Sequence, residues 1–133
     1  QVIAACAGDN KFQLLYPDNY TLSDKIKTVA KEIYRAENVI FSDEAMKNIE
    51  ALEKNGKGNL PVCIAKTQYS FSDDAKAVGA PEYFDIHVRD VVLYNGAEFV
   101  TVLLGDIMTM PGLSRKPNYE RINVIDGEIV GLS

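Results

Sequence analysis

Tryptophan is absent from this chain of 133 residues, and histidine and cysteine are scarce: His87 is alone, and Cys6 and Cys63 are the two cysteines. Two cysteines are too few for the disulfide scaffolds that stabilise small secreted domains. Together with one histidine, they also cannot supply the usual four ligands of a structural zinc site. We therefore expect two reduced, buried thiols in a cytoplasmic protein.

The chain also has no excess of basic residues. The chain has 14 Lys and Arg against 19 Asp and Glu, which gives a formal net charge of −5. Nucleic acid is therefore not an expected partner, because phosphate backbones are bound by basic surfaces. No apolar run approaches the roughly 18 residues of a membrane span, and no basic leader precedes the apolar residues 2–7. With 47% hydrophobic residues, the chain fits one globular domain and no membrane partner.

Two segments in the first half carry apolar residues at helical spacing. In the first, Thr21 or Ser23 is the expected N-cap, and one apolar face follows: Ile26, Val29, Ala30, Ile33 and Tyr34. In the second, Ser42 is the expected N-cap and Asn55-Gly56 the stop. The apolar residues 39–41 between them are interpreted as a short link, and residues 2–7 as the last turns of a helix.

Strand patterns dominate the second half. Residues 60–65 and 99–104 are apolar runs typical of buried strands, and residues 84–88 alternate as in a half-buried strand. Asn95-Gly96 predicts a tight hairpin in which both turn residues have positive φ, and Asp126-Gly127 predicts a last hairpin. Ser72 is expected to open a short helical turn that ends at Gly79. The predicted fold is α/β with α+β character: a small mixed sheet with antiparallel hairpins, packed against two N-terminal helices.

The loop that follows the predicted strand 60–65 is the best candidate for a binding site. It places an ammonium group, hydroxyls and an amide where α/β proteins position ligand contacts: Lys66, Thr67, Gln68 and Ser70. Such a set could hold an anion. The alternative is structural. Lys66 would then form a buried ion pair, and the hydroxyls would satisfy backbone groups in the turn; the candidate carboxylates are Asp73, Asp74 and Asp106.

Residues 105–113 leave the predicted strand 99–104 in a similar way. Asp106 is followed by Met108 and Met110, which could form an adaptable apolar wall beside a flat ring. Equally, this loop could pack the sheet against another domain.

Other motifs point to no chemistry. His87 has no evident partner for a nucleophilic triad, so we expect it to face solvent or to make a hydrogen bond. Gly56-Lys57-Gly58 is not a phosphate-binding loop, because Ala51 stands where that motif needs its first glycine and no serine or threonine follows Lys57.

Five stretches together resemble the C-terminal part of formate–tetrahydrofolate ligases, also called 10-formyltetrahydrofolate synthetases. They are Ala-Lys-Glu-Ile-Tyr at 30–34, Gly-Asn-Leu-Pro-Val-Cys at 58–63, Ala-Lys-Thr-Gln-Tyr-Ser at 65–70, Val-Arg at 88–89, and the run 105–113. The resemblance implies that residues 1–19 are a helix end and linker from a preceding domain. It implies that residues 20–133 are the C-terminal domain.

The resemblance also implies a function. Ligases of this family join formate to tetrahydrofolate with ATP, and Mg²⁺ and a monovalent cation assist. Their nucleotide, formate and cation contacts lie in a large N-terminal domain. This part would then hold no catalytic, cofactor-binding or metal residue, would line the folate side of the cleft, and would be inactive alone. Its partners would be the other domains of a homo-oligomeric parent. The alternatives are a stand-alone folate-binding or interaction module and, less favoured, a small enzyme that uses Lys66 and Asp106.

Overall fold

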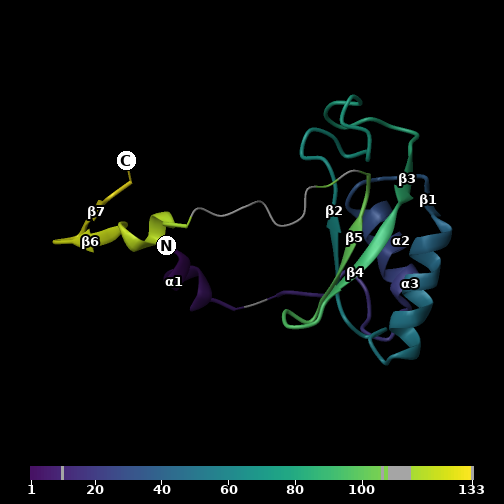
Figure 1. Ribbon diagram of the computed structural model, residues 1–133, viewed down its shortest axis with the longest axis horizontal. Helices are drawn as coiled ribbons and strands as arrows, with labels where there is room; N and C mark the ends of the chain where they lie inside the picture. Colours follow the sequence, from purple (N-terminus) through teal and green to yellow (C-terminus); the bar gives the residue numbers. More distant parts are fainter. Residues whose placement is uncertain (10, 106, 108–114, 133) are drawn as a thin grey trace.

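The computed structural model describes residues 1–9, 11–105, 107 and 115–132. Two helices and five strands form the body of the molecule (Figure 1). Helix α2 spans Leu22–Glu32 and α3 spans Asp43–Lys54. The strands are β1 (Asn38–Phe41), β2 (Val62–Ala65), β3 (Asp85–Val88), β4 (Asp90–Tyr94) and β5 (Phe99–Leu103). This arrangement confirms the predicted α/β fold with a mixed sheet against two helices.

Both predicted N-caps are present. The Thr21 hydroxyl accepts a hydrogen bond from the Asp24 amide, and the Ser42 hydroxyl accepts one from the Ala45 amide. The apolar face of α2 is shorter than predicted, because the helix ends at Glu32 and the chain turns through Arg35, whose φ is 62°. Ile33 is therefore 51% exposed, not buried.

The short apolar segment 39–41 was expected to be a link, but this expectation was wrong. It belongs to β1, which pairs in parallel with β3. The other three strands form a second set. In it β2 is parallel to β5 and β4 is antiparallel to β5, so β5 is the central strand, as its apolar run predicts. The pair β1–β3 and the set β2–β5–β4 are joined by the peptide group between Val88 and Arg89. Its carbonyl accepts a hydrogen bond from the Ser42 amide, and its amide donates one to the Leu103 carbonyl.

The core lies between this sheet and the two helices. The largest of its fully buried side chains come from both the helices and the sheet, and Lys25 is a charged residue among them: Leu22, Lys25, Ile26, Ile49, Ile86, Val88, Val100, Val102 and Leu104. None of the described helices has the length and apolar character that a membrane crossing requires.

The β4–β5 hairpin is present, but its turn differs from the prediction. Four residues, 95–98, connect Tyr94 to Phe99, and the Ala97 amide donates to the Tyr94 carbonyl. Neither Asn95 nor Gly96 has a positive φ; Glu98 has, at 55°. In this four-residue loop, the left-handed backbone conformation is therefore at Glu98, two residues after Gly96.

Residues 72–79 form no helix, contrary to expectation. The Ser72 hydroxyl accepts from the Asp74 amide, two residues on, and this local turn replaces the contact that an N-cap makes three residues on. The chain then turns back, and Gly79 forms a parallel bridge with Ser70.

The two thiols were expected to be buried, and both are exposed. Cys63 lies in β2, an edge strand with one side open, and is on its exposed face. Cys6 lies in α1 (Val2–Cys6), a helix that buries none of its residues.

A short 3-10 helix, η1 (Asn118–Glu120), precedes the last hairpin, which consists of β6 (Asn123–Ile125) and β7 (Glu128–Val130). Asp126 and Gly127 both have positive φ, 50° and 83°, as the Asp-Gly pair predicts. Figure 1 draws this hairpin and α1 away from the body of the molecule.

Candidate functional site

The two loops singled out from the sequence begin at the same edge of the sheet. Strands β2 and β5 run in parallel with Ala65 opposite Leu103, and the Leu104 amide donates to the Ala65 carbonyl. Parallel strands end on one edge, so Lys66 and Gly105 leave the sheet as neighbours. We call residues 66–79, which follow β2, the clasp loop.

Lys66 is bound to its own loop. Its Nζ donates to the Thr67 carbonyl at 2.7 Å and to the Ser70 carbonyl, and it lies 5.0 Å from the centre of the Tyr34 ring. Among the described residues, Lys66 makes no ion pair of the predicted kind. Burial lowers the pKa of Lys66, and the charge of Asp73 partly opposes that change. The side chain therefore holds the loop closed around a partly desolvated ammonium.

The hydroxyl groups of the clasp loop also serve its backbone. Thr67 Oγ1 accepts from the Tyr69 amide, and Ser70 Oγ accepts from the Ser72 amide and donates to the Ala77 carbonyl. These contacts agree with the structural alternative, in which the hydroxyls satisfy backbone groups of the turn. Gln68 is exposed, so among the four candidates it presents its side chain to solvent.

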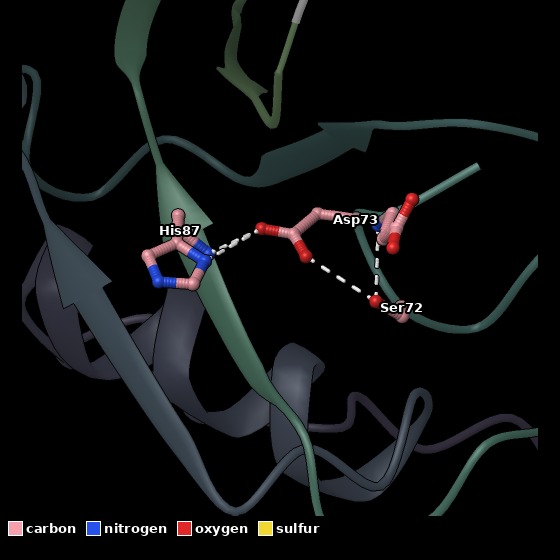
Figure 2. A network of polar contacts seen from close by, with 4 residues as sticks. Ser72, Asp73 and His87 are labelled. Carbon is pink, nitrogen blue, oxygen red and sulfur yellow. Dashed lines mark hydrogen bonds and ion pairs between the residues drawn. The ribbon is translucent and has the colours of Figure 1, made fainter. Parts of the chain in front are cut away.

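Asp73 ties the clasp loop to β3. Its Oδ2 accepts from the His87 amide at 2.8 Å and lies 3.0 Å from His87 Nδ1, while Ser72 Oγ contacts Oδ1 (Figure 2). His87 thus makes the hydrogen bond that was expected for it, and its side chain is 63% exposed. The carboxylate lies between the serine and the histidine. A nucleophilic triad needs the histidine in that place, so this cluster positions a loop and does not activate Ser72.

The second candidate loop falls mostly outside the described residues. Asp106, Met108 and Met110 are among those not described. Its first residue, Gly105, has a φ of 78°, and its carbonyl accepts a hydrogen bond from the Arg89 guanidinium at 3.3 Å.

A hollow of about 390 Å³ lies beside the clasp loop and was missed by the sequence analysis. Its charged and aromatic walls are Arg35, Glu37, Phe71, Glu82 and Tyr83. Arg35 and Tyr83 are both non-glycine residues with positive φ, 62° and 58°, which no sequence pattern signals. None of the four clasp-loop candidates lines it.

The turn that contains Gly56-Lys57-Gly58 uses its backbone internally. The Gly56 amide donates to the Glu53 carbonyl and the Lys57 amide to the Leu52 carbonyl, as in a helix C-terminus. Lys25, buried in α2, donates to the carbonyls of Gly58 and Leu60 at 3.0 and 3.1 Å. The Gly56 and Lys57 amides, which a phosphate cradle would have to use, are thus occupied. Within the described part of the chain, no group of three or more His, Cys, Asp or Glu side chains is placed to hold a metal ion.

A sequence model of one family, formate–tetrahydrofolate ligase, matches residues 1–133. The chain belongs to the formate–tetrahydrofolate ligase family. Among curated members, the formate–tetrahydrofolate ligase of an Arthrobacter species is 47% identical over 133 residues, which are 99% of this chain. That of Paenarthrobacter aurescens is also 47% identical over 133 residues. That of Allorhizobium ampelinum is 52% identical over 126 residues, or 95% of this chain.

The chain spans about a quarter of the length of these ligases: 24% of the Arthrobacter and Paenarthrobacter proteins and 23% of the Allorhizobium protein. The resemblance seen in the five sequence stretches is thereby confirmed at the level of the family. The division at residue 19 and the roles of the candidate site residues remain predictions.

Proposed function

We propose that this chain works as one part of a formate–tetrahydrofolate ligase, the C-terminal domain with a short preceding linker, in an enzyme that joins formate to tetrahydrofolate with ATP. The observation that carries the proposal is the family match over every residue of the chain, together with its span of about a quarter of the relatives' length. The product would be 10-formyltetrahydrofolate, in a cytoplasmic, homo-oligomeric enzyme.

The part described here supplies no catalytic group. Nucleotide, Mg²⁺ and a monovalent cation would bind to the rest of the ligase. Support comes from the residues that could have held them: the Gly56 and Lys57 amides are occupied, and Asp73 is engaged by β3. These residues do not fit a phosphate or a metal ion, so no step of the reaction is assigned to them.

The clasp loop would contribute a wall on the folate side of the cleft. Its own hydrogen bonds fix its shape, and exposed Gln68 presents a polar side chain at the sheet edge. Asp106, Met108 and Met110 would continue this wall from the neighbouring loop.

The first test is an assay of the 133-residue chain and of the complete ligase with ATP, Mg²⁺, formate and tetrahydrofolate. We expect 10-formyltetrahydrofolate from the complete ligase and none from the chain alone. Product from the chain alone would overturn the assignment of a non-catalytic role. Binding of tetrahydrofolate by the chain without turnover would favour the stand-alone binding module.

The second test addresses the folate wall in the complete ligase. Gln68→Ala should raise KM for tetrahydrofolate and leave kcat and the KM values for ATP and formate unchanged. Lys76→Ala, an exposed position of the same loop, is the matched control. A changed KM for ATP with an unchanged KM for tetrahydrofolate would place the loop elsewhere.

A further inference from the structure

The segment 117–132, which we call the hairpin unit, is well formed but buries none of its side chains. It contains η1, β6 and β7, and every residue of both strands is exposed. Gly131, with a φ of 81°, crosses so close to the backbone of Arg121 that a Cβ there would collide with the Arg121 carbonyl group. Close backbone packing therefore fixes the conformation of the hairpin unit, although the unit has no buried core of its own.

Apolar side chains lie on both faces of the hairpin, and one of the two faces also carries Asn123 and Glu128. Val124 lies directly opposite Ile129, and these two define one face, with exposures of 62% each. Ile125 and Val130 belong to the opposite face, because neighbouring residues of a strand point to opposite sides. They are 54% and 37% exposed. A hairpin at a protein surface usually has one polar face, whereas both faces of this hairpin carry exposed apolar side chains that a contact surface could cover.

A two-stranded hairpin is at best marginally stable in water. The hairpin unit thus needs a partner, and a partner with one flat surface would leave half of its apolar side chains exposed.

We propose that the hairpin unit inserts between two apolar surfaces of the remaining ligase polypeptide and anchors this domain to it. This inference rests on the proposed function. The occupant follows from length, because about three quarters of each relative's chain lies outside the matched region. A second copy of this domain is a poorer partner. Two copies related by a two-fold axis through one face of the hairpin would cover that face and leave the opposite face exposed.

Hydrogen exchange tests the proposal on the complete ligase and on the 133-residue chain. Amides of residues 123–130 should exchange rapidly in the chain alone and at least about 100-fold more slowly in the complete ligase. Residues 99–103 of β5 serve as the internal reference, protected in both samples. Equal exchange of the hairpin amides in the two samples would refute the insertion. Protection that rises with concentration of the chain alone would also refute it, in favour of self-association.

Substitution of each face separately tests whether both are covered. Val124→Asp and Ile125→Asp, one for each face, should each accelerate hairpin exchange in the complete ligase by about 10-fold or more. Val78→Asp, an equally exposed apolar position in the clasp loop at 75%, is the control and should leave hairpin exchange unchanged. An effect at only one of the two faces would contradict insertion. Ligase turnover is measured in parallel: an inactive wild-type ligase with a protected hairpin would refute the proposed function alone.

Discussion

At the scale of single residues, Lys25 shows how the fold uses a buried charge. The side chain is fully buried, yet its Nζ donates to two carbonyls in the turn after α3 and lies 5.8 Å from the centre of the Tyr16 ring. These contacts join α2 to the segment that leads into β2. The cost is desolvation of the ammonium, which lowers the pKa of Lys25 against a smaller opposing effect of Asp18.

Lys25→Met should destabilise the chain by about 1–2 kcal/mol at neutral pH, because the Gly58 and Leu60 carbonyls lose their donor. The cost should grow in alkaline solution. Between the lowered pKa in the folded state and the ordinary value of 10.5, the unfolded chain binds more protons at Lys25 than the folded chain. The wild type therefore gains unfolding free energy relative to the variant as pH rises through this window.

Urea unfolding of both proteins at several pH values measures this difference. Lys31→Met, at an exposed position of the same helix, is the control. A gap between wild type and Lys25→Met that narrows as pH rises would contradict the argument.

Asp73 and His87 should contribute unequally to stability. Asp73→Ala removes both the bond to the His87 amide and the contact with its ring, and should cost about 1–2 kcal/mol. His87→Ala keeps the amide bond and loses a contact whose imidazole is largely exposed, so it should cost less than about 1 kcal/mol. Thermal unfolding of the two variants gives the comparison. A larger loss from His87→Ala would mean that the ring, and not the amide, holds the loop.

Sequence reasoning located the clasp loop but did not assign its contacts. The order of Lys66, Thr67 and Ser70 after a strand was visible in the sequence, but the carbonyls that receive Lys66 depend on how the loop folds back on itself. Lys25 could have been found, since it lies one turn after Leu22 on the apolar face of α2. Its partners, more than thirty residues away, could not.

At the scale of elements, the β4–β5 turn offers a test of backbone strain. Glu98 adopts a φ of 55°, a conformation that costs a residue with a side chain about 1 kcal/mol relative to glycine. Glu98→Gly should therefore leave stability unchanged or raise it by up to about 1 kcal/mol, despite the added freedom of the unfolded chain. Asn95→Gly, in the same loop without a positive φ, should be destabilising. Equal losses in both variants, measured by urea unfolding, would show that Glu98 is not strained.

Helices were easier to predict than strand pairing. The caps Thr21 and Ser42 act within three residues, so the sequence carries the whole signal. Strand β1 has four residues, and its identity depends on β3, 47 positions further along the chain. The peptide between Val88 and Arg89 likewise makes its two hydrogen bonds only when Ser42 and Leu103 lie beside it, so the local sequence does not predict them.

At the scale of the whole molecule, the apolar burial that the structure describes lies in the middle of the chain. Among the described residues, the core members fall between Leu22 and Leu104, while α1, β6 and β7 bury nothing. The terminal segments therefore add no apolar burial to the isolated chain, although they would add it in a larger ligase. Tyr16 marks the boundary on the N-terminal side, because its hydroxyl accepts a hydrogen bond from the Val62 amide and its ring lies near Lys25.

A chain trimmed to residues 12–116 should consequently unfold within about 2 °C of the full chain, because it loses only segments that bury nothing and keeps Tyr16. Trimming further to residues 20–116 should cost about 1–2 kcal/mol, since the Val62 amide at the start of β2 loses its acceptor and Lys25 loses the ring beside it. Calorimetry of the three chains measures both effects. A large loss on the first trimming would mean that the terminal segments support the core, and would weaken the argument that the hairpin unit is reserved for the rest of the ligase.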